Sequence, residues 1–159
     1  DASGAYPSNP LVNTLIGGAW GSFTHIPDWP ENEGLTPADW GVTDLFVQAG
    51  RHAPDVRMAR YDTAYDQVQR TFSALAGFAG DDLKTTIEGN EAYIEDAGVP
   101  VASYLAPGTD HTILGTPGLY TLTVDGEPFL DWLTRYAGGD GVPDVSCGDD
   151  CGPPAGAGA

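Results

Sequence analysis

An aspartate and a histidine, Asp66 and His111, each follow a segment with the pattern of a β-strand. A carboxylate can orient an imidazole and stabilise its charged form, and the imidazole can take a proton from a hydroxyl group near neutral pH. The two residues lie about one strand–helix–strand unit apart, so in a parallel sheet both would reach the same edge. The pattern predicts the acid and the base of a hydrolase that uses a hydroxyl nucleophile.

Two further carboxylates compete with Asp66 for the role of the acid. Asp62 stands at the end of the first predicted strand, and Asp110 adjoins His111, where the two side chains are poorly placed to face each other. The structural alternative is that Asp66 caps a helix and that His111 is a plain surface residue. Spacing alone leaves these interpretations open.

The segments around these residues alternate between helix and strand patterns. Thr36 is a good helix cap, Pro37 suits the first helical position, and Gly50 is expected to end that helix. Residues 1–35 are rich in Gly, Pro, Asn and Trp and predict a long ordered loop with short elements such as 11–16. The predicted strands cover 56–62, 100–106 and 120–124. The predicted helices cover 37–49, 64–78, a short stretch within 87–98, and 129–137.

This alternation is typical of an α/β fold with a parallel sheet and flanking helices. Two or three strands are few for an open sheet, so we expect the C-terminal half of an α/β-hydrolase-like sheet, completed by a segment upstream of Asp1. In that fold the catalytic residues follow the chain order Ser, then Asp or Glu, then His. We expect residues 1–137 to belong to the catalytic domain and the Gly/Asp/Pro-rich residues 138–159 to form a poorly packed tail.

The composition excludes several classes of partner. The 159 residues are 41% hydrophobic, which is enough for one domain with a core. Six Lys or Arg stand against 23 Asp or Glu, and a net charge of −17 argues against binding to nucleic acid or to anionic membrane surfaces. The chain has no long apolar run, so no membrane insertion is expected, and without a leader pattern Asp1 is expected to lie within a longer or processed protein.

Cys147 and Cys151 form a C-x₃-C pair near the end of the chain. We expect a disulfide rather than free thiols, and with it an oxidising, extracellular location. The three histidines of the chain lack metal-ligand spacing, so no metal and no cofactor is expected. The alternating aspartates of 140–150 leave a Ca²⁺ loop as an alternative, although the segment lacks the terminal glutamate and the fixed glycine of an EF-hand.

An aromatic segment around residues 20–29 offers side chains that would line a pocket. Trp20 and His25, together with Tyr65 beside Asp66, are the predicted substrate-binding residues, because aromatic rings with a polar edge stack on sugar rings. The alternative is that the segment simply packs on the core.

Several stretches resemble the pectin acetylesterase and Notum family. DTAYDQVQ (62–69) resembles the family's motif around the catalytic acid, which implies that Asp66 is the acid, that Gln69 is the motif glutamine and that Asp62 is not the acid. YLAPGTDHTIL (104–114) resembles the strand and loop that bear the catalytic histidine, which implies that His111 is the base. DASGAY (1–6) is similar to the strand end after the nucleophile helix, and FLDWLTRYAGGDGVPDVSC (129–147) to the end of bacterial members.

The resemblance implies a secreted serine carboxylester hydrolase that acts on acyl groups of sugars, proteins or small alcohols. The chain departs from the family twice: no serine lies in a Gly-x-Ser-x-Gly setting, and Asp110 and Thr112 flank His111 where plant members have a cysteine. The nucleophile is therefore expected from an N-terminal half, in the same precursor or as a second chain, and this chain alone is expected to be inactive. The alternative is a noncatalytic structural or binding component of an extracellular assembly that keeps an esterase-like fold.

Overall fold

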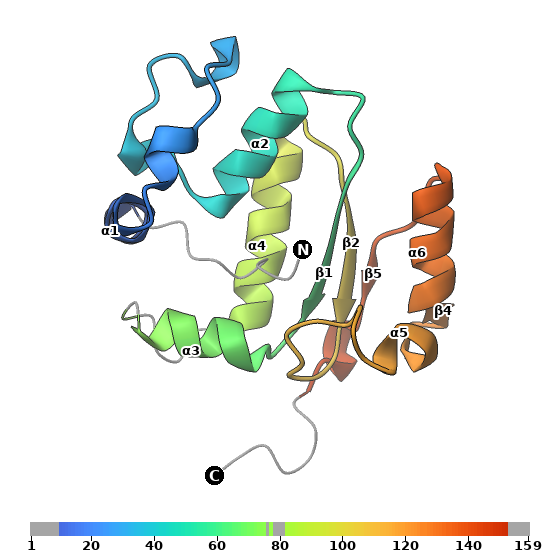
Figure 1. The fold of residues 1–159 in the computed structure, drawn as a ribbon. Helices are drawn as coiled ribbons and strands as arrows, with labels where there is room; N and C mark the ends of the chain where they lie inside the picture. Colours follow the sequence, from blue (N-terminus) through green and yellow to red (C-terminus); the bar gives the residue numbers. More distant parts are fainter. Residues whose placement is uncertain (1–9, 76, 78–81, 153–159) are drawn as a thin grey trace.

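A three-stranded parallel sheet forms the centre of the computed structural model, which describes residues 10–75, 77 and 82–152 (Figure 1). Strands β1 and β2 pair in parallel from Met58 opposite Val101 to Thr63 opposite Ala106. Strand β5 pairs in parallel with the other edge of β2, which gives the order β1-β2-β5. The strands are β1 (Met58–Thr63), β2 (Val101–Ala106) and β5 (Val145–Ser146). The expected parallel sheet is confirmed, and its first two strands lie where the sequence predicts them.

Helices cover both faces of this sheet, because neighbouring side chains of a strand point to opposite faces. On β1, Arg60 reaches the carbonyl of Ile87 in α4, whereas the next residue, Tyr61, contacts the ring of Phe129 in α6. Figure 1 shows α2 and α4 on one side of the sheet and α6 on the other. The helices are α2 (Val42–His52), α4 (Leu83–Asp96) and α6 (Phe129–Gly138). The chain is thus a mixed α/β structure with a flanked parallel sheet.

The core on the α6 side is built from aromatic rings. Tyr104, Phe129 and Trp132 are almost completely buried, and their centroids lie 5.0–6.1 Å apart in edge-on and stacked arrangements. The buried Tyr104 hydroxyl donates to the Glu127 carbonyl at 2.6 Å and accepts from the Val124 amide at 3.1 Å. The polar tip of this large side chain is therefore satisfied inside the core.

The N-terminal third differs from its prediction. Instead of a long loop, its described part holds helix α1 (Pro10–Ala19) and the short 3₁₀ helices η1 (Ser22–His25) and η2 (Pro30–Asn32). The family-like stretch 1–6 lies outside the described residues. The expected short element at 11–16 is confirmed within α1. More of the segment is helical than expected, because its glycines and prolines flank short helices rather than replace them.

The predicted helix 37–49 is in fact two helices. Asp39 accepts from the Thr36 amide and hydroxyl at 2.8 and 2.7 Å, and Asp44 accepts from the Gly41 amide at 2.7 Å. Each bond closes a separate helix start, so the 3₁₀ helix η3 (Pro37–Asp39) is followed by α2. The expected end at Gly50 is wrong, since Gly50 lies inside α2.

Gly50 is needed for packing rather than for termination. A Cβ built on it would lie 2.3 Å from Val99 Cγ1 and 2.8 Å from Met58 Cε. Helix α2 therefore approaches the sheet at a distance that only glycine allows.

Helix α3 (Gln67–Leu75) begins later than predicted, because Asp66 occupies its capping position. Helix α4 begins earlier, since Asp82 accepts from Thr85 Oγ1 at 2.7 Å and starts the helix there. The predicted strand 120–124 adds nothing to the main sheet. Its residues form helix α5 (Gly118–Thr121) and one half of a small antiparallel hairpin, β3 (Thr123–Val124) with β4 (Glu127–Pro128).

The expected poor packing after Gly138 is wrong for the residues up to Cys151. Val145 is buried in strand β5, and the indole nitrogen of Trp132 donates to the Pro143 carbonyl at 2.8 Å. Cys147 and Cys151 form the predicted disulfide and are themselves buried. The third strand of the sheet thus comes from the Gly/Asp/Pro-rich segment. Residues 153–159 lie outside the described part.

No helix among the described residues is both long and apolar enough to cross a membrane.

Candidate active site

The carboxyl ends of β1 and β2 continue into two loops that are bonded to each other. Beyond the paired strands, the amide of Ala64 donates to the Ala106 carbonyl at 2.9 Å, and that of Tyr65 donates to the Gly108 carbonyl at 3.0 Å. The Thr63 hydroxyl also donates to the Asp110 carbonyl, at 2.7 Å. The loop that bears Asp66 and the loop that bears His111 are therefore held in a fixed register.

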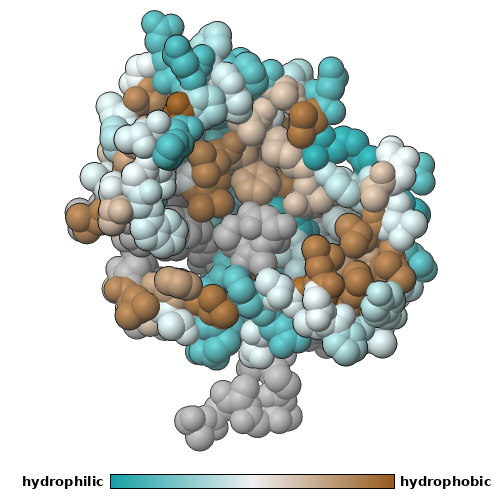
Figure 2. All heavy atoms as spheres, viewed as in Figure 1, coloured by the Kyte–Doolittle hydropathy of each residue, from teal (hydrophilic) through white to brown (hydrophobic). Residues whose placement is uncertain are grey.

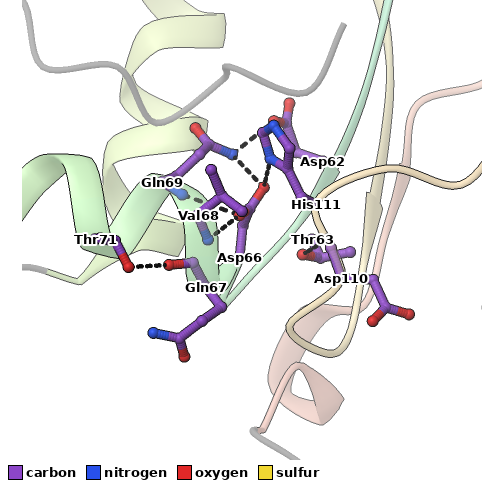
Figure 3. Close-up of polar contacts among 9 residues, drawn as sticks. All are labelled: Asp62, Thr63, Asp66, Gln67, Val68, Gln69, Thr71, Asp110 and His111. Carbon is purple, nitrogen blue, oxygen red and sulfur yellow. Dashed lines mark hydrogen bonds and ion pairs between the residues drawn. The ribbon is translucent and has the colours of Figure 1, made fainter.

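Asp66 and His111 meet across these loops, as Figure 3 shows. Asp66 Oδ2 lies 2.8 Å from His111 Nδ1, within hydrogen-bond distance. The Asp66 side chain is completely buried, whereas the His111 side chain is 41% exposed. A buried carboxylate thus holds one ring nitrogen of a partly exposed imidazole.

The second oxygen of Asp66 caps helix α3. Oδ1 accepts from the amides of Val68 at 2.8 Å and Gln69 at 3.0 Å. The helix N-terminus favours negative charge, and the two amides fix the carboxylate plane. Asp66 therefore has both of the roles that the sequence left open: Oδ1 caps helix α3, and Oδ2 binds His111.

Gln69 joins Asp66 to a second buried carboxylate. Its amide nitrogen donates to Asp66 Oδ2 at 3.1 Å and to Asp62 Oδ1 at 3.3 Å. Asp62 and Gln69 are 2% and 8% exposed. The sequence places Gln69 three residues after Asp66, but the bridge to Asp62 depends on how α3 folds back on β1, and sequence reasoning missed it.

The competing carboxylates take other roles. Asp62 accepts a hydrogen bond from Gln69, and the Asp110 side chain points away from the His111 ring (Figure 3). Asp110 contributes its backbone carbonyl, which accepts from Thr63. Among the residues that the structure describes, Asp66 is the carboxylate that bonds His111.

The neighbouring phenol stays neutral. Burial, and after it the negative charge of Asp110, raises the pKa of Tyr61 well above its ordinary value. A group that resists ionisation beside Asp62 and Asp66 adds no further negative charge to this edge of the sheet.

The Asp66–His111 pair leaves one ring nitrogen of the histidine available for proton transfer. Because Asp66 binds Nδ1, the other ring nitrogen of His111, Nε2, is the one that can accept a proton from a hydroxyl group. No serine in the described part of the chain hydrogen-bonds to this histidine. The geometry therefore provides an oriented base and its acid, and a nucleophile is needed to use them.

The predicted substrate-binding residues lie on different surfaces. Tyr65 is half-buried in the Asp66 loop, whereas His25 is exposed in η1. Trp20 is 76% exposed and lines a hollow of about 240 Å³ with Phe23 and Trp40. Neither Asp66 nor His111 lines that hollow. The structure thus brings Tyr65 to the candidate active site and places Trp20 in a separate depression.

A cluster of carboxylates lies between α4 and β5. Ligand oxygens of Glu91, Glu95 and Asp144 all lie within 4.8 Å of one another. Burial raises the pKa of the Glu95 carboxyl, and the neighbouring negative charge of Glu91 raises it further. The buried Arg60 guanidinium lies 2.9 Å from Glu91 and offsets part of the negative charge. Oxygen ligands of this kind suit a hard cation, and Asp144 is the member that the acidic run 140–150 contributes.

Comparisons of the chain with protein-family models, with curated proteins and with solved structures find no match. The resemblance to the pectin acetylesterase and Notum family stays a prediction from its motif residues.

Proposed function

We propose that this chain supplies the acid and the base of a serine carboxylester hydrolase of the α/β-hydrolase type. The observation that carries the proposal is the 2.8 Å contact between the completely buried Asp66 carboxylate and Nδ1 of the half-exposed His111. The strands and loops that position the pair lie at the carboxyl edge of a parallel sheet, where α/β proteins place their ligands.

The proposed reaction runs through His111 Nε2. This nitrogen takes the proton of a serine hydroxyl while the serine oxygen attacks the ester carbonyl, and the imidazolium then gives the proton to the leaving alcohol. A water molecule, deprotonated in turn by His111, releases the acid from the acyl-enzyme. Asp66 stabilises the imidazolium without taking the proton itself.

The nucleophile comes from a segment that precedes this chain in its precursor or from a second chain. No serine of the sequence lies in a Gly-x-Ser-x-Gly setting. Within the described part, β1 pairs with β2 alone, so its other edge is open to a further parallel strand. We propose that this segment completes both the sheet and the site.

Apolar side chains beside the site support a covering segment. Val68, Phe72 and Leu75 form a stripe on α3 and are 37%, 59% and 78% exposed, and Leu114 is 68% exposed in the loop after His111. Figure 2 shows apolar surface on α3 and also over α5 and α6. Exposed apolar side chains that gather on one face of a helix can mark an interface.

The substrate class follows from the motif resemblance: acyl groups on sugars or small alcohols. The disulfide between Cys147 and Cys151 supports a secreted protein, because such bonds persist in oxidising compartments.

The test is reconstitution with the upstream segment of the encoding gene, followed by hydrolysis of a model acetyl ester. We expect His111→Ala to lower kcat by at least about 10³-fold, as in triad hydrolases. His52→Ala is the matched control and should keep full activity, because His52, at the end of α2, stacks on Trp29 and pairs with Glu31 of η2. A fluorophosphonate probe should label one serine of the added segment.

Full activity of His111→Ala would refute the proposal. A complete, folded preparation with no esterase activity and no labelled serine would favour the alternative, a noncatalytic component of an extracellular assembly.

A further inference from the structure

A polar cavity of about 580 Å³ lies between α1, η3, α2 and α4. Its lining includes three side-chain amides and two hydroxyls, contributed by Asn13, Gln48, Asn90, Thr43 and Tyr93. This volume is in the range of small-molecule sites. We call it the α1–α2 cavity, and Figure 1 shows α1, α2 and α4 standing together around this region.

Two of these amides are buried with an oxygen that lacks a partner. Asn13 and Gln48 are 7% and 8% exposed, and within the described residues neither Asn13 Oδ1 nor Gln48 Oε1 accepts a hydrogen bond. A buried polar group without a partner costs free energy, and native chains keep few of them. Both atoms belong to residues that line the same cavity, which points to a partner from outside the chain.

The charge of the cavity disfavours an anionic occupant. Asp39 and Asp44 line it, and their carboxylates already accept from Thr36, from Gly41 and from the Tyr93 hydroxyl. No lysine, arginine or histidine is among its lining residues. With a net charge of −17 on the chain, a phosphate or a uronate would meet repulsion without a counter-charge.

An aromatic hollow adjoins the polar cavity. The 240 Å³ depression lined by Trp20, Phe23 and Trp40 shares Asn13 with the α1–α2 cavity. Trp20 is 76% exposed, although a large aromatic side chain is favoured in buried positions. An accessible indole next to buried amides presents one apolar face and several hydrogen-bonding groups to the same ligand.

We propose that the α1–α2 cavity and its aromatic hollow bind a neutral carbohydrate. Sugar hydroxyls donate and accept, so they satisfy an amide in either orientation, and the C–H face of a pyranose ring packs on an indole. Asn13 and Gln48 bind ring hydroxyls, and Trp20 stacks on the adjoining sugar unit. None of the lining residues belongs to the loops that carry Asp66 and His111, so this site is independent of the proposed esterase activity.

The test measures binding of the chain to neutral oligosaccharides by isothermal titration calorimetry, with a panel of neutral hexose and N-acetylhexosamine oligomers. We expect at least one series to bind, and oligogalacturonates, which carry one carboxylate per unit, to bind at least about tenfold more weakly. His111→Ala should bind like the wild type.

Gln48→Met and Asn13→Leu keep a side chain of similar length and shape and remove its polar end. Each is expected to weaken binding at least about tenfold, because a buried hydrogen bond to the ligand is lost. The melting temperature should stay the same or rise, because no partner within the described chain is lost. A purely structural amide would instead lower it.

Trp20→Ala provides a variant with little risk of unfolding, since Trp20 is largely exposed. It should also weaken binding, whereas Trp29→Ala, which removes an aromatic ring that lines neither hollow, should not. The proposal is overturned if no neutral saccharide binds at millimolar concentration, if the variants bind like the wild type, or if oligogalacturonates bind as tightly as neutral chains.

Discussion

The two sites of this chain treat their buried polar groups in opposite ways. Around Asp66, both carboxylate oxygens are bonded, one to the α3 amides and the other to His111 and Gln69. In the α1–α2 cavity, the buried oxygens of Asn13 and Gln48 have no partner among the described residues. Both regions flank the same sheet, so burial alone does not explain the difference.

The Asp66–His111 pair is held in place by hydrogen bonds within the chain, whereas the α1–α2 cavity has buried polar atoms that a ligand could bind. An acid that must orient a base needs every one of its own bonds in place before substrate arrives, because a displaced imidazole loses the proton transfer. A binding cavity instead gains affinity from groups that are satisfied only when a ligand enters. The comparison predicts that substitutions at the first site affect catalysis and stability, and that substitutions at the second affect binding.

Asp66→Asn is expected to give the largest effect. The amide would keep one oxygen for the α3 cap but would turn a donor toward His111 Nδ1, which favours the wrong tautomer of the imidazole. In the reconstituted enzyme kcat should fall by about 10³–10⁴-fold, as for the equivalent change in serine proteases. Asp110→Asn is the control, because its side chain points away from the ring. Equal kcat values for Asp66→Asn and Asp110→Asn would contradict the proposed role of Asp66 in orienting His111.

The two glutamines allow a direct comparison of stability. Gln69→Leu removes the donor shared by two buried carboxylates, and we expect it to lower the free energy of unfolding by about 1–3 kcal/mol in urea titrations. Gln48→Met, at similar burial, should cost nothing or should stabilise the chain. If Gln48→Met proved as destabilising as Gln69→Leu, the amides of the cavity would have a structural role after all.

Gly50→Ala examines the opposite face of the helix that carries Gln48. The added methyl would meet Val99 and Met58 at 2.3 and 2.8 Å, so α2 must shift away from the sheet. Such overpacking typically costs about 1–3 kcal/mol, which thermal unfolding would register. Gly89→Ala is the matched control, since nothing lies within 4 Å of its added Cβ and alanine favours helix. A loss of stability in the control alone would contradict the packing that we describe.

Tyr93→Phe should have the smallest effect, at the rim of the cavity. The Tyr93 hydroxyl donates to Asp44 at 2.9 Å, and this bond raises the pKa of the half-exposed phenol. Its contribution is fully present below the ordinary value of about 10 and is lost as the pH rises through the higher pKa of the folded state. At neutral pH the variant should differ by within about 0.5 kcal/mol.

Unfolding in urea at pH 7 and pH 11 checks this expectation. The difference between wild type and Tyr93→Phe should shrink toward the alkaline end. A difference that grows with pH would mean that the Tyr93–Asp44 bond does not stabilise the folded chain.

Local patterns were sufficient for the parts of the fold that local forces decide. The strands at 58–63 and 101–106, the helix after Pro128 and the short C-x₃-C disulfide all follow from nearby residues. The order of Asp66 and His111 along two neighbouring strands was also visible, because parallel strands bring their carboxyl ends to one edge. Spacing could not choose among Asp62, Asp66 and Asp110.

Other features depended on partners that are distant in the chain. Strand β5 exists because Val145 finds a free edge of β2, although its own segment is rich in Gly, Pro and Asp. Gly50 lies within a helix because Val99 packs against it. A local pattern records the preference of a residue, whereas pairing and close packing depend on what the rest of the chain presents.

The sequence by itself determined an α/β chain in which an aspartate and a histidine follow successive strands. The tertiary structure decided which carboxylate meets the imidazole, and it gave Gln69 its place between two buried aspartates. It also gathered Asn13 and Gln48, whose amides look ordinary in the sequence, around one cavity. Hydrogen bonds between side chains have short range and strict geometry, so only the folded chain determines which of them form.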